Sequence, residues 1–595
     1  MKSHHIVGVV GGMLLLALAL TAGQAVRRDS VTVTGTYEPA PLEEHERAVR
    51  SLPARELELL ASTLADLLRL DAALDLRERA PGGVQSGLSI RGGTFGQTLV
   101  LVNGVRMNDA QSANHNMDIP LPPQSVERIE VLRGSGSAFY GSDAVGGVVN
   151  VITRAPEYSS VRLRAAAGNF GVNQERAAWN LLRGPLAQQF SFSRDFSSGF
   201  APNRDYRNLS LAGITRLDAR TYRTQIILAH NDRPFGAERF YGNFPSWERT
   251  RTWFASVRQT LGEKTEASVA FRRHTDLFVL YRDRPEVYTN RHAVESWVFS
   301  LRRKESLSTN SRLHYGAEGF RDSIASNNLG SHDRAWGAGY AAFDARALRR
   351  FSLSVGVRQE VYRNLRGQVT PTVAGGVWLS EHLKLRASLG RAFRLPSYTD
   401  LYYHDPANLG SPDLRPEQAW SYDGGLDWRA GSWRGELSLF QRRDRDVIDY
   451  VRRSPNDIWR ATNIHRLTFS GVEAGAATVI RRRHQIDLRY TALRGASEAL
   501  GSYESKYVFQ YPVHSGLAAW QASLPGGFLA RTRVGAIARY NRGAYAVWDV
   551  FAGWARRRVQ PFVQFTNLTS SRYEEIPGVP NPGRSIMGGV EWVSR

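Results

Sequence analysis

The chain has 595 residues, no cysteine and a formal net charge of +21. The lack of cysteine excludes disulfides, thiolate metal ligands and cysteine nucleophiles. After residue 25 the sequence contains no charge-free apolar run of about 20 residues, so a helical membrane protein is excluded. A closed β-barrel remains compatible with the mean hydropathy of −0.36, because its short strands alternate apolar and polar residues.

Residues 1–25 have the three parts of a secretory signal peptide. Lys2 supplies the positive start, residues 6–20 form an apolar run, and small residues lead to a predicted cleavage after Ala25. The alternative is a membrane anchor, for which the apolar run is short. We therefore expect an exported protein.

The positive charge comes mainly from arginines spread through strand-like segments. A basic chain ordinarily raises nucleic acid as a partner, but export argues against it and we expect none. Arginine pairs well with phosphates and carboxylates. Two interpretations stay open: solvated charges of a lumen and its loops, or contacts with lipopolysaccharide phosphates or an anionic solute.

Residues 26–50 form a polar linker with one short strand-forming patch at residues 29–34. An isolated strand former on flexible chain is suited to adding itself to the edge of a partner's sheet. We interpret this patch as a docking segment.

Residues 51–156 mix helix and strand signals. Leucines between residues 57 and 70 recur at roughly helical spacing, and Thr63 with Asp66 offers a capping box. Residues 98–102 predict a strand buried on both faces, and Asn103-Gly104 predicts a tight turn. A strand of this kind needs a covered environment.

Residues 126–154 read as two strands joined by a glycine-rich bend with a polar and aromatic stretch. This segment resembles the plug domain of TonB-dependent outer-membrane receptors. The resemblance implies an N-terminal α+β plug lodged inside the pore of its own barrel.

Residues 157–595 repeat segments in which apolar and polar residues alternate. Leu353, Val355 and Val357, for example, alternate with polar or small residues, as expected where one face meets lipid and the other a lumen. Divided over the roughly 22 strands of plugged outer-membrane transporters, this length leaves about 20 residues for each strand and connection. We expect an all-β membrane barrel of about 22 antiparallel strands.

Further motifs follow the family's order along essentially the whole mature chain. They lie at residues 88–93, 393–403, 410–417, 463–473, 565–573 and 582–584. Each motif alone is weak evidence for the resemblance, but their occurrence in the family's order is strong evidence. In size and layout the chain is most similar to the vitamin B12 receptors of the family.

The resemblance assigns roles to two sets of residues. It implies that Asp29, Ser30, Val31, Thr32, Val33 and Thr34 are the Ton box, through which such receptors engage TonB and the inner-membrane energising complex. It also implies a lock between plug and barrel formed by Arg91, Arg133, Glu417 and Glu473. The alternative is that each of these charges pairs within its own domain or is solvated.

The polar stretch 107–118 lies where a plug apex would face the outside. Its candidate solute contacts are Gln111, Asn114, His115 and Asn116, and Tyr402 and Tyr403 are weaker loop candidates. His115 with Met117 could touch a soft metal, but a lone histidine is usually not a metal site. Whether a metal binds stays open, as does a purely structural role for the loop.

The sequence contains no phosphate-binding loop, zinc-protease motif or convincing nucleophile elbow. We therefore expect no enzyme and no cofactor. The resemblance implies active, TonB-dependent transport of a scarce solute, cobalamin-like or a ferric siderophore, by a monomer in the outer membrane of a Gram-negative-type bacterium. A passive porin-like diffusion channel and an outer-membrane barrel enzyme are the alternatives.

Overall fold

A computed structural model describes residues 32–33, 40–41, 45–54, 61–346, 350–363, 365–497 and 503–594. The predicted signal peptide lies outside these residues, as do residues 29–31 and 34 of the predicted Ton box. The other two Ton-box residues form β1 (Thr32–Val33), which pairs antiparallel with β2 (Ala40–Pro41).

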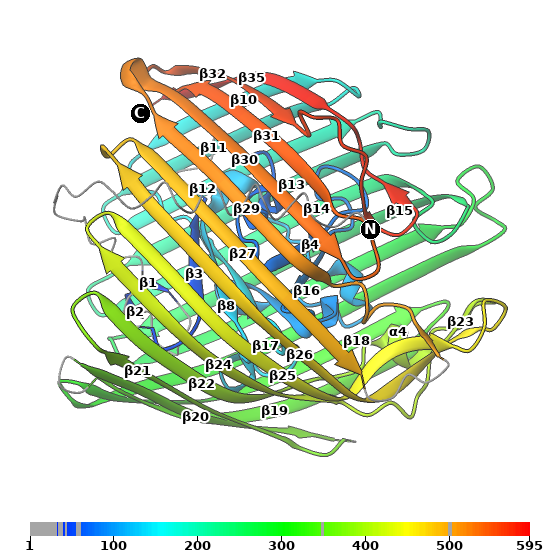
Figure 1. Ribbon diagram of the computed structural model, residues 1–595, viewed down its shortest axis with the longest axis horizontal. Helices are drawn as coiled ribbons and strands as arrows, with labels where there is room; N and C mark the ends of the chain where they lie inside the picture. The colour runs from blue at the N-terminus through cyan, green and yellow to red at the C-terminus, as the bar shows by residue number, and fades with distance from the viewer. Residues whose placement is uncertain are drawn as a thin grey trace, which may run out of the picture.

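Twenty-two long antiparallel strands close into a barrel in the described part of the chain, which confirms the predicted architecture (Figure 1). The first strand, β10 (Ser160–Gly168), pairs with the last, β35 (Ser585–Ser594), and this pairing closes the sheet. The strands between them are β11 (Asn173–Arg183), β12 (Leu186–Ser197), β13 (Tyr206–Asp218), β14 (Tyr222–Glu238), β15 (Pro245–Leu261), β16 (Thr265–Val279), β17 (Thr289–Ser308), β18 (Ser311–Ser326), β19 (Gly330–Ala345), β20 (Phe351–Tyr362), β21 (Gln368–Trp378), β22 (Leu383–Arg394), β24 (Glu417–Ala430), β25 (Trp433–Arg452), β26 (Trp459–Ile480), β27 (His484–Ser497), β29 (Pro512–Ser523), β30 (Phe528–Arg539), β31 (Tyr545–Trp554) and β32 (Val559–Thr566).

Alternation along the strands separates a lipid-facing surface from a polar lumen. In β20, Val355 and Val357 are 43% and 45% exposed, whereas Ser354 before them and Arg358 after them are buried. Successive side chains of a strand point to opposite faces of the sheet. The predicted two-sided pattern is therefore present in the folded barrel.

Connections differ in length at the two ends of the barrel. Residues 184–185 and 431–432 are turns at the end where the C-terminus lies, which we call the turn end. The opposite, loop end carries the longer connections 395–416, 503–511 and 567–584 in the described ranges (Figure 1). These contain α4 (Tyr398–Tyr402), β23 (Asn408–Leu409), β28 (Glu504–Ser505), β33 (Glu574–Ile576) and β34 (Val579–Pro580).

Every helix among the described residues is too short or too polar to span a bilayer.

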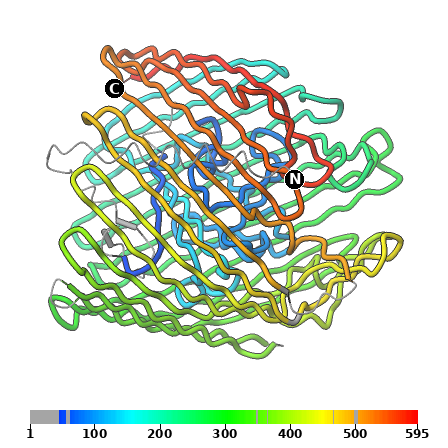
Figure 2. The backbone as a smooth tube through the Cα atoms, in the orientation of Figure 1, coloured from blue at the N-terminus to red at the C-terminus, as the bar shows by residue number. Residues whose placement is uncertain are grey.

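The N-terminal residues fill the lumen with a small mixed domain, drawn in blue inside the barrel in Figure 2. Its main sheet has the order β3-β8-β9-β6-β7, with β4 and β5 forming a separate hairpin. The elements are β3 (Val49–Pro53), α2 (Leu64–Leu68), β4 (Leu74–Arg77), β5 (Gly87–Ile90), β6 (Thr98–Val102), β7 (Val105–Arg106), β8 (Val126–Arg133), α3 (Ser137–Tyr140) and β9 (Gly147–Thr153). The plug sheet thus begins slightly before the boundary expected at residue 51.

The interior strand β6 is buried along its whole length, as its continuous apolar run predicted. It pairs in parallel with β9 and antiparallel with β7. Asn103 and Gly104, with φ of 48° and 82°, make the tight turn between β6 and β7. Asparagine and glycine tolerate this left-handed backbone better than other residues.

The leucine spacing predicted a helix within residues 54–70. Helix α2 is shorter and covers Leu64–Leu68, and residues 55–60 lie outside the described part of the chain. The predicted capping box is formed: Thr63 accepts from the backbone of Asp66, and the Asp66 carboxylate accepts from the backbone of Thr63. Apolar spacing indicated the buried face correctly, but the chain turns into β4 soon after Leu68.

Candidate functional site

Arg91 joins the plug to two carboxylates of the barrel wall. It follows β5 and is held with a left-handed φ of 53°, a costly backbone for arginine. Its Nε and Nη2 donate to the two carboxylate oxygens of Glu473 at 2.8 and 2.9 Å, and Nη1 donates to Asp423 at 2.5 Å. The guanidinium carbon also lies 4.2 Å from the centre of the Phe440 ring. Such a bidentate, charge-assisted pair is strong and geometrically specific.

Arg133 at the end of β8 reaches the same carboxylate. Its Nη1 lies 3.3 Å from Glu473 Oε2, and its Nη2 donates to Asp71 at 2.9 Å. Both arginine side chains and that of Glu473 are 3% exposed. Glu473 on β26 is therefore the one wall carboxylate among these that holds both predicted plug arginines.

The fourth predicted lock residue, Glu417, is not paired with Arg91 or Arg133. It accepts from Arg394 at 2.9 Å and from the plug side chain Gln97 at 2.7 Å. The register explains this difference, because Arg394 on β22 lies directly opposite Glu417 on β24. Glu417 touches the plug through a neutral donor and forms its ion pair within the barrel.

Sequence reasoning missed further plug-to-wall ion pairs. In these pairs a plug charge meets a lumen-facing partner on a barrel strand or loop: Asp75 with Arg539, Arg69 with Glu575, Arg50 with Asp487, and Asp109 with Arg272. Charged residues at lumen-facing positions of alternating strands were the available signal, but the sequence does not say which plug charge each one meets.

Asp71 gives the plug contacts a predicted pH dependence. Burial opposes ionisation of this carboxyl, but Arg133 and Arg50 outweigh it and hold its pKa well below the ordinary value. A depressed pKa contributes stability above the unfolded-state pKa of about 3.9, and that contribution is lost as pH falls through the folded value. We expect the protection of plug amides, measured relative to the intrinsic exchange rate at each pH, to stay constant from pH 7 to about 5 and to fall below about pH 4. Asp71→Asn should reduce this acid response, and an identical response in the variant would contradict the assignment.

The predicted solute-contact segment is buried at the loop end of the plug. Gln111, His115 and Asn116 are 4%, 3% and 4% exposed. Connection 395–416 covers them, because the backbone N–H groups of Tyr398 and Thr399 donate to the carbonyls of Ala110 and Gln111 at 2.8 and 3.0 Å. We call this connection the capping loop. Direct solute contact by these three side chains stays a prediction that requires the capping loop to open.

The remaining candidates are more accessible. Asn114, Tyr402 and Tyr403 are half-buried, and the Tyr402 ring stacks on His332 with centroids 3.7 Å apart. Aromatic stacking here ties the capping loop to β19. Solute contact by these three side chains stays a prediction.

His274 and Asp276 were not singled out by the sequence, yet they meet the plug at His115. Both point from β16 into the lumen because they are two residues apart on one strand. Nε2 of His115 lies 3.4 Å from Asp276, and Nε2 of His274 lies 3.2 Å from Asp118. Polar side chains at alternate positions of a strand were the signal that could have found them.

Cavities remain between plug and wall. One of about 200 Å³ lies between α2 and strands β29 to β32, and includes Arg69, Asp71 and Asp549 in its lining. A larger one of about 910 Å³ lies towards the turn end, where Glu127 and Arg128 of the plug face Lys264 of a turn. The plug therefore has room on its turn-end side.

Comparison with known proteins accounts for both parts of the chain. Residues 158–568 match the model of the TonB-dependent receptor-like β-barrel, and residues 41–148 match the TonB-dependent receptor plug domain. A vitamin B12 transporter, BtuB, of Vibrio vulnificus is 24% identical over 70% of each chain. The iron-regulated outer membrane virulence protein of Vibrio cholerae is 25% identical over 74% of each chain.

Solved structures share the fold. The FrpB iron transporter of Neisseria meningitidis superposes with a TM-score of 0.79 at 15% identity, covering 92% of this chain and 100% of that one. The siderophore receptor PirA of Acinetobacter baumannii gives 0.75 at 13% identity, covering 92% and 98%. The plug, the 22-stranded wall and the two family models together show that this chain belongs to the TonB-dependent receptor family.

Proposed function

We propose that this protein takes up a scarce solute of the cobalamin or ferric-siderophore type across the outer membrane, and that TonB drives it through residues 29–34. The vitamin B12 transporter and the siderophore and iron receptors to which the chain is similar support this class of solute. We further propose export by cleavage after Ala25 and function as a monomer.

One observation favours gated uptake over passive diffusion: a folded plug occupies the lumen and is tied to the wall by buried ion pairs. A diffusion channel needs no such domain and no docking segment ahead of it. Movement of the plug must therefore be coupled to solute binding through a difference in affinity between plug states.

An enzymatic role has less support. The matching family models describe a receptor and its plug, and the buried carboxylates of Asp71, Asp423 and Glu473 are engaged by arginines. Hydrolysis of lipid or peptide that one point substitution abolishes would favour the enzyme instead.

The deciding experiment is a binding screen of purified protein against cobalamins, ferric siderophores, haem and other metal complexes. We expect tight binding of one class, and no passage of small sugars in liposome swelling. Free flux of small solutes through the intact protein would refute gated uptake and favour the porin.

A further inference from the structure

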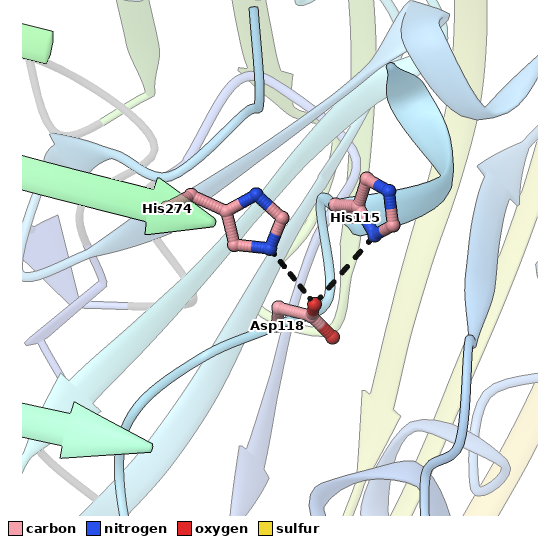
Figure 3. A group of neighbouring side chains, drawn as sticks. All are labelled: His115, Asp118 and His274. Atoms are coloured by element: carbon pink, nitrogen blue, oxygen red, sulfur yellow. Dashed lines mark hydrogen bonds and ion pairs between the residues drawn. The ribbon is translucent and has the colours of Figure 1, made fainter. Parts of the chain in front are cut away.

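Two histidines converge on one carboxylate beneath the capping loop, where plug and wall meet. Figure 3 shows His115 and Asp118 of the plug and His274 of β16, with both rings turned towards Asp118. Nδ1 of His115 lies 3.7 Å from Asp118 Oδ2, and Nε2 of His274 lies 3.2 Å from the same oxygen. The plug supplies two of these groups and the wall supplies the third.

The three groups are spaced as ligands of a small metal ion. Their nitrogen and oxygen atoms all lie within 4.8 Å of one another. Zinc bonds of about 2.0 to 2.2 Å place neighbouring tetrahedral ligand atoms about 3.4 Å apart. The distances of 3.2 and 3.7 Å to Asp118 lie on either side of that spacing.

One nitrogen aimed at this point has no hydrogen bond. Nδ1 of His115 is buried and makes no hydrogen bond, because its contact with Asp118 Oδ2 is 3.7 Å long, and the side chain is 4% exposed. A buried polar atom left unsatisfied is costly, and native structures rarely leave one without a reason. The atom points to a ligand between the two rings.

The opposite nitrogen of each ring faces a second carboxylate. Nε2 of His115 lies 3.4 Å from Asp276, and Nδ1 of His274 lies 2.9 Å from Asp109. Carboxylates in this position fix the tautomer and the orientation of metal-binding histidines and raise their basicity. Each ring thus turns its other nitrogen towards Asp118.

Asp118 presents one oxygen, Oδ2, to both rings, and this oxygen is hydrogen-bonded to Nε2 of His274 at 3.2 Å. The other oxygen, Oδ1, accepts from Arg233 at 3.1 Å. Two imidazoles and one carboxylate suit Zn²⁺, Co²⁺ or Ni²⁺, whereas Ca²⁺ and Mg²⁺ prefer oxygen ligands throughout.

We propose that His115, Asp118 and His274 bind one divalent transition-metal ion of the zinc class, with Asp109 and Asp276 orienting the two rings. The ion cross-links plug and wall at the loop end. It is separate from the transported solute, and the site goes beyond the proposed function because it does not depend on which solute is carried. Displacement of the plug takes His115 and Asp118 away from His274 and dismantles the site.

The test uses the full-length protein, purified from membranes, stripped with a chelator and reloaded with Zn²⁺ or Co²⁺. We expect one ion per chain, and with Co²⁺ the visible absorption bands of a tetrahedral site. His115→Gln and His274→Gln should each weaken binding at least about tenfold, and Asp276→Asn should weaken it by about tenfold.

His314→Gln is the matched control, because His314 is a buried lumen histidine that pairs with one carboxylate, Asp344, at 3.3 Å. It should bind the ion as the wild type does. Heat-dependent migration in gels reports barrel folding, and His115→Gln leaves every barrel residue unchanged. The proposal is overturned if the wild type binds no stoichiometric ion, if both histidine variants bind as tightly as it does, or if His314→Gln loses binding equally.

Discussion

Glu473→Ala should loosen the plug more than any other single change at the interface. The substitution leaves the guanidinium groups of Arg91 and Arg133 facing the wall without the carboxylate they share, while both remain buried. Removing one partner of a buried pair costs about 3 to 5 kcal/mol when the other charge is left uncompensated. Because Arg91 keeps Asp423 and Arg133 keeps Asp71, we expect the lower end of this range. We expect cells carrying the variant to become sensitive to bulky antibiotics, and the plug amides to exchange faster.

Glu295→Ala is the matched control for this prediction. Glu295 pairs with Arg273 at 2.7 Å, but the two side chains are 40% and 48% exposed. Exposed pairs contribute only about 0 to 1 kcal/mol, so antibiotic resistance and plug exchange should remain at the wild-type level. Unchanged exchange in Glu473→Ala, with this control also unchanged, would show that Glu473 does not hold the plug.

Val31→Pro should abolish uptake while leaving solute binding intact. Pairing with the edge of a partner's sheet depends on main-chain hydrogen bonds, and proline removes the N–H donor and fixes φ. The residue precedes the plug and lies far in sequence from the loop-end candidates. Uptake of the solute found in the binding screen should fall to the level of a strain without TonB.

Val31→Ala separates loss of the donor from loss of the side chain. Alanine keeps the N–H, so uptake should stay within a few-fold of the wild type. Uptake that survives the proline would show that residues 29–34 are not the Ton box. Loss of binding in the proline variant would show that this segment acts on the solute site itself.

Local patterns sufficed for most of the architecture. A period of two residues is a direct consequence of the pleated strand, so the exposed Val355 and Val357 and the buried Arg358 could be assigned to their faces from sequence. The buried strand β6 and its Asn103-Gly104 turn followed from equally local chemistry. The number of strands could be estimated because the number of residues after the plug limits how many strands and connections the barrel can contain.

Pairings across the interior could not be derived this way. The register places Glu417 opposite Arg394, and no local pattern contains that information. His115 looked isolated in sequence because its counterpart, His274, lies on β16. Burial of Gln111 depends on where the capping loop folds, which is decided by backbone hydrogen bonds at Ala110 and Gln111 rather than by side-chain pattern.

The edge position of β3 determines where tension would enter the plug. β3 is the outer strand of the plug sheet and the first one reached from the N-terminus. Just ahead of it, the carbonyl of Ala48 accepts from the backbone N–H of Arg133 at 2.9 Å, and the side chain of Arg133 holds Glu473. A pull on the N-terminal chain therefore acts first on the contacts of residues 45–48, which include the hydrogen bond from Lys384 Nζ to the His45 carbonyl, and through Ala48 on a residue that anchors the plug. Mechanical load would reach this anchor before it reached the centre of the sheet.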